Sequence, residues 1–539
     1  MNHISKLATY ALIAAGLAGR GTSIGADLAD NWSSFRNGGT SIVAGNLPVE
    51  WSSKNGITWQ QETDGYGQSA PIVFDGIVVV TSVIGEMKET CAVTAYQLRT
   101  GEKLWQTNVE ATQQGPSNYA NSRAAPTPVA DANNVCAFFE TGNLVAVDHQ
   151  GKKIWHRDLA KDLGPFEGRH GLGSSLAQTD DAVILNIEHK GPSFLIAINK
   201  QDGTTKWKVD RPSGSSWTSP VVIEASSQIV VSSAGSVTAY ESSNGKQIWS
   251  HEGLEGNSVP SPCPADGRIV VGARIPEFGS AADAAKSNLC ITVGESAQIA
   301  WRAASGVCDY ASPVVDGHQA YFLNKVGVLS CVDTDSGEEI YRQRLRAECW
   351  ATPIIAENGI FFFAKDGSVK VVKRGREFDV VATNALWDSS HPPKPETYKE
   401  ASRSHSHRAN DSHAEGSENP GGPPREGSSR RGGRAGGMIA AMMKDDANGD
   451  GILQADEISP DFRSMLKRVD SNGDGALDQK ELEAMAKSFA ERRSNSQASS
   501  RDPIVYGVAA VNGAIVVRTG TRLYCIDGNK ALNASETLP

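Results

Sequence analysis

One short pattern recurs along this chain: an apolar strand, a polar turn that contains glycine, and a second strand that closes on an aromatic residue. Glycine supplies the backbone dihedral angles of a tight turn, and the closing aromatic ring can cover the edge of a small sheet. A chain built from such hairpins is expected to be an all-β repeat protein. The clearest copies lie at residues 95–105, 146–155, 197–207, 239–249 and 331–341, and a more divergent copy ends at Trp301.

A second pattern lies upstream of the hairpins. A small or polar residue is followed by proline and a β-branched run, as in SAPIVFDG and TSPVVIEA. Each complete unit then has four short strands over roughly 40 to 50 residues, which is the period of a β-propeller blade. Blades bury their faces against their neighbours, and a closed ring leaves no free sheet edge. This second pattern occupies residues 69–76, 126–134, 218–225, 260–267, 311–317 and 351–359.

The number of blades follows from counting the units. Seven lie between about 64 and 385, and the third of them (173–189) is a weaker copy. Residues 503–528 supply three further strands, and 55–63 form an isolated strand with Trp59 at the position of the closing aromatic residue. The economical prediction is an eight-bladed propeller in which both ends of the chain complete one blade. A seven-bladed ring is the alternative.

The repeated pattern Ala-x-(Asp/Asn)-x-x-x-Gly-x-x-x-Trp resembles the pyrroloquinoline-quinone-like propeller repeat. That family includes the quinoprotein alcohol dehydrogenases and the outer-membrane assembly protein BamB. NWSSFRNGG (31–39) and LPVEW (47–51) look like the lead-in of exported propellers of this group, which are common in planctomycete-like bacteria. The resemblance covers roughly 31–385 and 503–528. It implies the fold, but a propeller fold by itself does not imply a function.

The N-terminus looks like an export signal. A lysine in MNHISK precedes the apolar run LATYALIAAGLAG, which is too short to span a bilayer, and small residues follow up to Ala26. We therefore expect an exported protein, periplasmic, extracellular or held in the cell envelope. No cysteine lies near the signal, which argues against a lipid anchor, and no other stretch is apolar and long enough for a membrane helix.

The propeller is interrupted before its last blade by a segment of different composition. Its first part is rich in Pro, Gly, Ser and charged residues and poor in apolar ones, so it cannot bury a core and is predicted to be disordered. The predicted segments are a signal peptide (1–26), a lead-in (27–54), the closing strand and blades 1–7 (55–385), a linker (386–437), an EF-hand pair (438–492), a second linker (493–502), blade 8 (503–530) and a tail (531–539).

Two acidic stretches inside the insert, DANGDGILQADE and DSNGDGALDQKE, match the calcium loop of an EF-hand. Such a loop needs oxygen ligands at positions 1, 3, 5, 9 and 12, a main-chain carbonyl at position 7 and glycine at position 6. Gly451 and Gly475 occupy the turn positions, and Leu453 and Leu477 can pair the two loops through a short ribbon. Two full matches predict a small helical module with two Ca²⁺ sites. The expected ligands are Asp446, Asn448, Asp450, Ile452, Gln454 and Glu457 in the first loop, and Asp470, Asn472, Asp474, Ala476, Asp478 and Glu481 in the second.

The module can serve structure or signalling. Five of the seven methionines lie in it, where they either fill a small core or form a target-binding face. Extracellular calcium is often millimolar and nearly constant, so we favour a structural role.

Propellers place ligands at the mouth of the central channel, where loops from all blades converge. Several aromatic residues stand three positions before the repeated proline, and charged residues lie near them. They form either a small polar pocket or a plug of the channel. The candidates are Arg123, His170, Trp217, Asp309, Tyr310, Glu348, Trp350 and Tyr506.

No catalytic motif stands out. The chain has no G-x-S-x-G, phosphate loop or H-E-x-x-H sequence. Quinoprotein enzymes resemble one another in a vicinal Cys–Cys disulfide and a cofactor calcium inside the channel, and no two of the eight cysteines here are adjacent. Pyrroloquinoline quinone is therefore not expected as a cofactor. The alternative is a quinone-dependent oxidoreductase or another enzyme with its site in the channel.

The net charge of −10 argues against nucleic acid or an anionic membrane as the main partner. Several cysteines lie in apolar strands, where cysteine is usually a small buried hydrophobe. The sequence thus predicts an exported, calcium-binding propeller that is a non-catalytic scaffold for an unknown protein or glycan.

Overall fold

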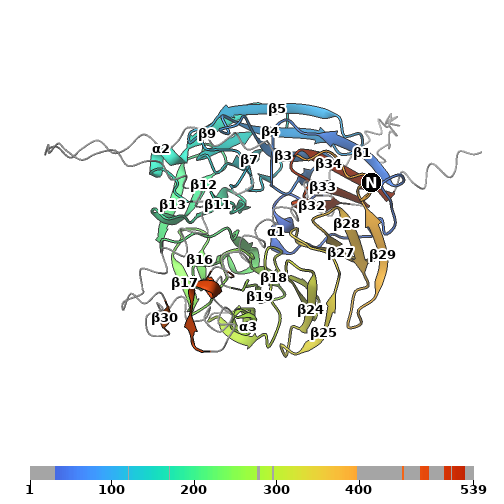
Figure 1. The fold of residues 1–539 in the computed structure, drawn as a ribbon. Coiled ribbons are helices and arrows are strands. Elements are labelled where there is room, and N and C mark those ends of the chain that lie inside the picture. The colour runs from blue at the N-terminus through green and yellow to red at the C-terminus, as the bar shows by residue number, and fades with distance from the viewer. Residues whose placement is uncertain are drawn as a thin grey trace, which may run out of the picture.

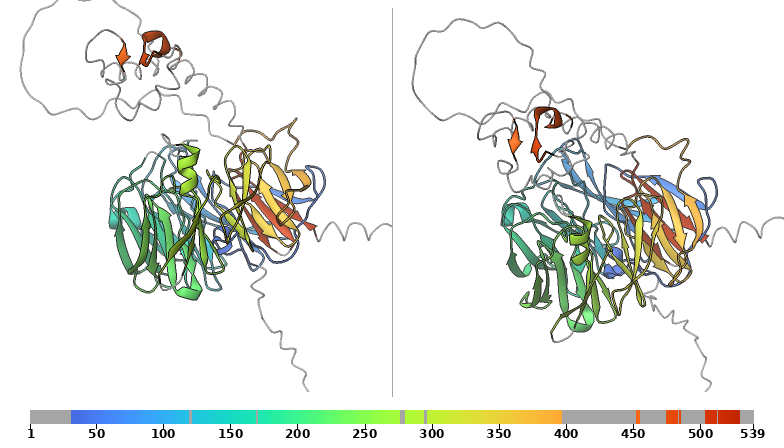
Figure 2. Two further views of the ribbon diagram at one scale, coloured as in Figure 1. Left: turned by 90° about the horizontal axis from the view of Figure 1, so that it is seen from below. Right: turned by 60° about the horizontal axis from the view of Figure 1, so that its bottom comes forward.

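The computed structural model describes residues 31–118, 121–168, 170–275, 280–293, 296–396, 452–454, 474–482, 484, 503–511 and 513–528. Its strands form eight four-stranded antiparallel sheets around a central axis, which confirms the predicted eight-bladed β-propeller (Figure 1). Figure 2 shows the ring edge-on, with the blades packed face to face.

Blades 1 to 7 each use four consecutive strands, ordered from the central channel outward. Blade 1 consists of β2 (Ile72–Phe74), β3 (Ile77–Ile84), β4 (Thr90–Gln97) and β5 (Lys103–Glu110), and blade 2 of β6 (Val129–Ala130), β7 (Val135–Phe138), β8 (Asn143–Val147) and β9 (Lys153–Asp158). Blade 3 consists of β10 (Ala177–Gln178), β11 (Ala182–Ile187), β12 (Ser193–Asn199) and β13 (Thr205–Arg211), and blade 4 of β14 (Val221–Ile223), β15 (Gln228–Ser233), β16 (Ser236–Glu241) and β17 (Gln247–Glu252). Blade 5 consists of β18 (Cys263–Ala265), β19 (Arg268–Val271), β20 (Leu289–Thr292) and β21 (Gln298–Arg302). Blade 6 consists of β22 (Val314–Asp316), β23 (Gln319–Leu323), β24 (Val328–Asp333) and β25 (Glu339–Arg344). Blade 7 consists of β26 (Ile354–Ala356), β27 (Gly359–Phe363), β28 (Ser368–Val372) and β29 (Val380–Ala385).

Blade 8 joins the two ends of the chain. Three strands come from the C-terminal part: β32 (Gly507–Val511), β33 (Ala514–Arg518) and β34 (Arg522–Asp527). The outermost strand, β1 (Ile57–Glu62), comes from the N-terminal part and pairs antiparallel with β34. The predicted closure is confirmed, and the seven-bladed alternative is excluded.

The recurring small residue and the closing aromatic residue lie opposite each other. In every blade the register between the third and fourth strands shifts by a β-bulge, and the aromatic side chain lies beside this bulge in most of them. Trp155 faces Ala146, for example. Cys290, Cys331 and Cys525 take the alanine position in blades 5, 6 and 8. These cysteines therefore serve as small apolar residues against an aromatic ring.

The closing tryptophan also binds the next blade. The Nε1 of Trp155 donates to the carbonyl of Lys200 at 2.8 Å, and the ring lies over Gly203. A Cβ at Gly203 would lie 2.8 Å from that ring, so glycine is required there by contact as well as by its φ of +75°. The same tryptophan–glycine contact occurs at Trp59–Gly101, Trp105–Gly151, Trp207–Gly245 and Trp301–Gly337.

The lead-in crosses the end of the ring opposite the insert. Trp32 pairs with Val73 of blade 1, and the amide of Val43 donates to the carbonyl of Ile355 in blade 7 at 2.9 Å. Between these contacts the short segment α1 (Arg36–Gly39), a turn whose residues have φ from +47° to +99°, lies at the centre of the ring (Figure 1). The other described helical segments are α2 (Leu159–Leu163), α3 (Ala281–Lys286) and the 3₁₀ turn η2 (Glu224–Ser226).

The insert leaves the ring after β29 and returns before β32. The predicted linker begins at residue 386, but Leu386 and Trp387 are buried, and buried Glu396 accepts a 2.7 Å hydrogen bond from the Thr519 hydroxyl. Apolar side chains and a buried carboxylate thus hold residues 386–396 against the propeller. Within the described residues, no helix is long and apolar enough to cross a membrane.

Candidate functional site

The central channel contains a cavity of about 420 Å³, which we call the chamber. It lies at the end of the ring where the outermost strand of one blade connects to the innermost strand of the next. All eight blades contribute to its wall. Because it opens among these connections, the chamber mouth is on the same end of the ring as the insert.

A ring of hydroxyl groups surrounds the chamber, and we call it the hydroxyl ring. Each hydroxyl oxygen accepts a hydrogen bond from the backbone N–H of the equivalent residue in the preceding blade, at 2.9 to 3.1 Å. One residue separates each of them from the innermost strand of its blade, and these bonds explain the recurring small polar residue at that place in the sequence. Its members are Thr127, Ser175, Ser219, Ser261, Ser312 and Thr352.

The ring of bonds begins at Ala70 in blade 1 and ends at Thr352 in blade 7. Blade 8 has Gly507 at the equivalent position, and a Cβ there would lie 2.5 Å from the Cα of Ala70. Close backbone packing therefore replaces the hydroxyl contact where the last blade meets the first.

Each hydroxyl of the ring uses its oxygen as an acceptor. A hydroxyl can also donate one hydrogen bond. Among the described residues, none of the six hydroxyl groups donates to a protein acceptor. The ring thus presents hydrogen-bond donors to whatever fills the chamber.

The lead-in closes the far end of the chamber. Phe35 lies on the chamber wall, and the neighbouring Arg36 is buried beneath it. The Arg36 guanidinium donates to the carbonyls of Pro262 and Pro313, one from each of two adjacent blades. Burial lowers the pKa of Arg36 to about 10. The chamber is therefore a dead-end cavity entered from one side.

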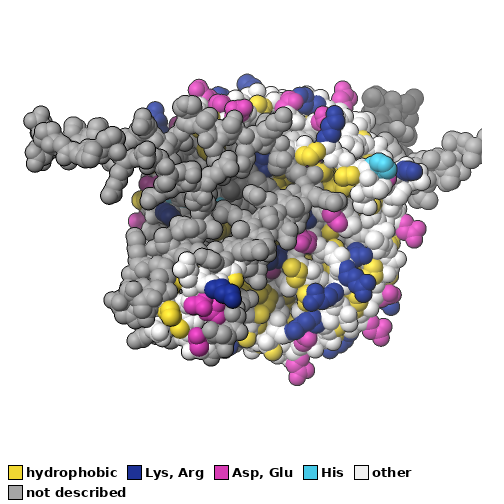
Figure 3. Space-filling view, in the orientation of Figure 1, with side chains coloured by type: hydrophobic (Ala, Val, Ile, Leu, Met, Phe, Trp, Pro, Cys, Tyr) yellow, Lys and Arg dark blue, Asp and Glu magenta, His cyan; other side chains and the backbone are white. Residues whose placement is uncertain are grey.

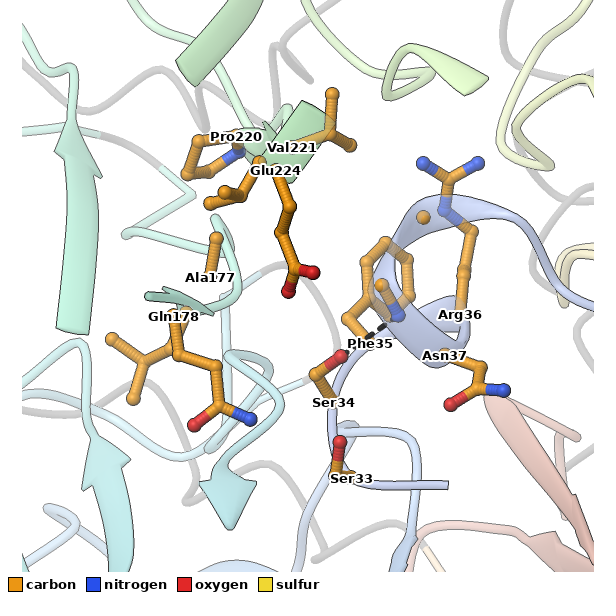
Figure 4. A pocket seen from close by; sticks show the side chains of 14 residues that line it. Ser33, Ser34, Phe35, Arg36, Asn37, Ala177, Gln178, Pro220, Val221 and Glu224 are labelled. Carbon is orange, nitrogen blue, oxygen red and sulfur yellow. Dashed lines mark hydrogen bonds between the residues drawn. The ribbon is translucent and has the colours of Figure 1, made fainter. Parts of the chain in front are cut away.

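A second cavity, of about 190 Å³, lies on the other side of this closure (Figure 4). Ser34 and Phe35 form one wall, and Pro220, Val221 and Glu224 of blade 4 face them. Phe35 lines both cavities and separates them.

Aromatic side chains line the chamber mouth. Tyr310 and Trp350 lie with ring centroids 4.9 Å apart, and Trp350 and Tyr506 are 6.2 Å apart. On the opposite side Trp217 contacts His170, and its Nε1 donates to the carbonyl of Gly171 at 2.9 Å. Tyr310 is 41% exposed, so part of this aromatic surface is open to solvent.

Arg123 lies directly behind the wall. Its guanidinium stacks on the ring of Tyr66 at 3.3 Å, and the Tyr66 hydroxyl is 2.8 Å from that of Tyr506. Arg123 is fully buried, and all three guanidinium nitrogens have no hydrogen-bond partner among the described residues. Burying an unpaired charge is costly. Among the described residues Arg123 forms no ion pair, so the Tyr66 ring is the one described group that offsets its positive charge next to the chamber.

The loop that carries Arg123 is under backbone strain. The next residue, Ala124, is buried with φ +47°, a conformation that an L-residue adopts only at a cost. Its amide donates to the Glu140 carboxylate at 2.9 Å, and Glu140 forms a buried ion pair with Lys88 at 3.1 Å. Two hydrogen bonds between Gln68 and the backbone of Arg123 complete the support.

Five of the eight predicted channel residues line the chamber: His170, Trp217, Tyr310, Trp350 and Tyr506. The other three are not among the wall residues. Arg123 lies behind the wall, as described. The Asp309 carboxylate accepts a bond from the amide of Lys325 at 2.9 Å, and Glu348 lies 3.8 Å from the ammonium group of Lys365. Both acidic groups thus have partners that are not wall residues.

Sequence reasoning missed the hydroxyl ring, Phe35 and Arg274 as wall residues. The repeated position before the proline was visible in the sequence, and its polar character was the available signal for the ring. No comparable signal marked Phe35 or Arg274, because each lies outside the repeated pattern.

The structure describes part of the two predicted calcium loops. Leu453 pairs with Leu477 in the ribbon of β30 (Leu453–Gln454) and β31 (Ala476–Leu477), and Gly475 has φ +82°. The Glu481 carboxylate accepts from the amide of Asp478, and the Asp478 carboxylate accepts from the amide of Glu481 at 2.7 Å. The expected ligands Ile452, Gln454, Asp474, Ala476, Asp478 and Glu481 are described; Asp446, Asn448, Asp450, Glu457, Asp470 and Asn472 lie outside the described residues.

All eight cysteines fall within the described residues, and none forms a disulfide. Every one is buried, and burial raises the pKa of thiols such as Cys91 and Cys308 to about 12. They are therefore unreactive structural residues at neutral pH.

The comparison with protein families decides the relationship of the chain. A family model described as outer membrane protein assembly factor BamB matches residues 24–174, 169–262, 193–304 and 291–411. These matches cover well over half of the sequence. The chain belongs to this BamB family of PQQ-like β-propellers.

A curated relative is more limited in extent. The outer membrane protein assembly factor BamB of Yersinia pestis is 24% identical over 218 residues, 40% of this chain and 51% of that protein. The chain thus spans about half the length of the curated relative it matches.

Solved structures with similarity include BamB from Moraxella catarrhalis, with 13% identity, a TM-score of 0.45, and coverage of 61% of this chain and 87% of that one. A europium-containing methanol dehydrogenase has 10% identity and a TM-score of 0.48, covering 67% and 87%. Quinohemoprotein alcohol dehydrogenase from Comamonas testosteroni has 13% identity and a TM-score of 0.38, covering 64% and 77%. Similarity at this level carries no conclusion about activity or ligand.

Proposed function

We propose that this BamB-family propeller is an exported, calcium-binding scaffold that binds a protein or glycan without catalysing a reaction. The composition of the chamber wall supports this role best. Among the described wall residues, His170 and Arg274 are the only members of the Asp, Glu, His, Lys and Arg classes. General acid–base and nucleophilic catalysis need paired, positioned titratable groups. Aromatic rings with a few hydroxyl groups are instead typical of the lining of a ligand-binding site.

Calcium binding is proposed for the insert. The two loops offer the carboxylate, amide and main-chain oxygens that Ca²⁺ prefers. Glu481 is 5% exposed and faces the amide of Asp478, so its carboxylate is held at the end of the second loop, where a bidentate ligand belongs. Bound calcium would neutralise this acidic cluster, and the Leu453–Leu477 pair would link the two sites.

Calorimetry on the full chain tests the calcium proposal. Glu457→Gln and Glu481→Gln each remove one charged ligand and are expected to weaken binding at their own loop strongly. Glu338→Gln changes an exposed acid on blade 6 and is the matched control, which should bind as the unaltered chain does. The absence of calcium heat at millimolar concentration, or an equal effect of all three substitutions, would contradict the proposal.

Export is proposed from the N-terminal sequence, which lies outside the described residues. The family name, outer membrane protein assembly factor, supports a location beyond the inner membrane. Cell fractionation of the full chain and of a variant without residues 1–26 tests this. The full chain should leave the cytoplasm, and the shortened chain should remain there; retention of both would count against export.

The second candidate is a quinone-dependent oxidoreductase. The facing aromatic rings at the mouth could stack on a planar cofactor, which is the observation in its favour. A cofactor calcium inside the channel would need anionic oxygen ligands, and the described wall offers the amides of Gln68 and Asn121 but no carboxylate. The residues present therefore do not fit that group, and the scaffold role is preferred.

A further inference from the structure

We propose that the chamber binds an acidic saccharide, namely the terminal sugar of a glycan that carries a carboxylate. This inference rests on the proposed binding role and names the ligand that the role would serve. Four properties of the chamber lead to it: its hydrogen-bond donors, its aromatic faces, its charge and its single entrance.

The hydroxyl ring favours a ligand rich in oxygen. Its six hydroxyl groups accept from the backbone and, among the described residues, donate to nothing in the protein. An apolar ligand would leave these donors unsatisfied, which is unfavourable in a buried site. A sugar offers hydroxyl and ring oxygens on several sides, so one residue of a glycan can accept from several members of the ring.

The aromatic mouth requires a ligand with a flat apolar face as well. Tyr310 and Trp350 are inclined to each other by 43°, and Tyr310 is partly exposed at the entrance. Aromatic side chains combine a large apolar face with little conformational entropy, and they suit ligands that are apolar on one face and polar at the edge. The C–H face of a pyranose ring has this character, whereas its hydroxyl groups point outward.

The charges around the chamber favour an anionic ligand. Arg274 lies on the wall and forms no ion pair among the described residues, and the buried guanidinium of Arg123 has no hydrogen-bond partner there. Asp309 and Glu348 are held by other groups, as shown above. A carboxylate on the sugar would offset positive charge that no acidic side chain among the described residues pairs with. Lys and Arg side chains also gather on the face of the molecule shown in Figure 3, over blades 6 and 7 at its lower right.

Because the chamber is closed at one end, it can accept the terminal sugar of a glycan but not an internal one. Phe35 and the buried Arg36 block the channel, so a ligand enters and leaves through the mouth alone. An internal sugar of a polysaccharide would need two openings. A volume of about 420 Å³ lies within the range of ligand pockets. One end of a glycan can therefore occupy the chamber while the rest of the chain lies outside.

Isothermal calorimetry on the full chain, in the presence of calcium, tests the proposal with three probes: glucuronate, glucose and benzoate. We expect glucuronate to bind more tightly than glucose, and benzoate to bind weakly or not at all. Arg274→Gln should weaken glucuronate binding by about 10- to 100-fold, the range of a lost charge-assisted hydrogen bond, and leave glucose binding unchanged. Arg344→Gln, on the outer strand β25, is the matched control and should change neither affinity. Tyr310→Ala should weaken both sugars.

The outcomes separate this inference from the wider scaffold role. No glucuronate binding, or benzoate binding as tight as glucuronate, would overturn the saccharide assignment, as would an Arg274→Gln variant with unaltered affinity. If that variant does not fold, the effect of Tyr310→Ala at the exposed mouth decides the question. The heat of calcium binding to the insert is measured independently. If calcium binds but no sugar does, only the saccharide assignment is refuted, and the proposed calcium-binding scaffold remains. Conversion of glucuronate to a product would instead refute the non-catalytic role.

Discussion

The contact between each closing tryptophan and the next blade's glycine makes a specific stability prediction. Gly203→Ala should destabilise the propeller more than Gly267→Ala does. Both glycines lie in hairpin turns with nearly equal dihedral angles, φ +75° and φ +73°. A Cβ at Gly203 would lie 2.8 Å from the Trp155 ring, whereas a Cβ at Gly267 would meet nothing within 4 Å. The second substitution therefore measures the backbone cost alone.

The magnitudes follow from these two environments. The left-handed conformation costs an L-residue about 1 to 2 kcal/mol, and both variants bear this cost. Displacing a packed side chain adds about 1 to 3 kcal/mol at Gly203. If the Trp155 ring moves enough to break its 2.8 Å bond to Lys200, about 1 kcal/mol more is lost. We expect a difference of about 1 to 4 kcal/mol in the free energy of unfolding.

Urea unfolding followed by circular dichroism measures this difference without relying on the emission of the tryptophan itself. A double variant provides the internal check: in a Trp155→Leu background, Gly203→Ala should cost no more than Gly267→Ala, because the clash is gone. Equal costs of the two glycine substitutions in the unaltered background would refute the role given to the tryptophan–glycine contact.

Three further predictions concern the ring and its charges. Ser219→Ala leaves the buried amide of Ser175 without its acceptor and should lower the free energy of unfolding in urea by about 1 to 3 kcal/mol. Ser219→Thr keeps the hydroxyl and should cost less. Equal losses in the two variants would contradict the role given to the hydroxyl ring. The Arg376 guanidinium lowers the pKa of Asp333 to about 2, so this carboxylate stabilises the fold above pH 4 and loses that contribution as the pH falls towards 2. Asp333→Asn should flatten the stability profile in that window, and an unchanged profile would refute the pairing. Gly507→Ala places a methyl group 2.5 Å from the backbone of blade 1 and should cost about 3 kcal/mol, seen as a lower melting temperature; an unaltered temperature would show that ring closure tolerates the added atom.

The fold was predictable because its repeated residues each have one local role. Glycine fixes the hairpin turn, tryptophan docks on the next blade, and the small residue opposite it makes room for the ring. Trp59 in an isolated strand was enough to place that strand beside the C-terminal blade, as pairing of β1 with β34 confirms. The strand-borne cysteines fit the same logic, since Cys290, Cys331 and Cys525 stand in for alanine.

The chamber was predictable only where the repeat reaches it. Trp217, Tyr310 and Trp350 each stand four residues before an innermost strand, so their convergence follows from ring symmetry. Tyr506 also lines the chamber, but it directly precedes β32 and so does not share that position. Charged side chains in the connecting loops have no such constraint. Asp309 turns to a backbone amide, and its direction depends on a tertiary contact that no periodicity encodes.

The closure of the channel could not be predicted for a related reason. The lead-in is outside the repeat, and the path of Phe35 and Arg36 depends on carbonyl groups of Pro262 and Pro313 that are more than two hundred residues away. The strained backbone of Ala124 likewise accompanies a hydrogen bond to Glu140, which pairs with Lys88, and both partners are distant in sequence.

Reconstitution with pyrroloquinoline quinone tests the central claim, that the chamber binds without catalysing. The full chain would be incubated with the quinone and calcium, freed of unbound cofactor, and examined by absorption spectroscopy and by dye-linked alcohol oxidation. The present account predicts no retained chromophore and no oxidation, because the described chamber wall lacks the carboxylate ligands of a cofactor calcium. A retained quinone spectrum together with alcohol-dependent dye reduction would contradict it.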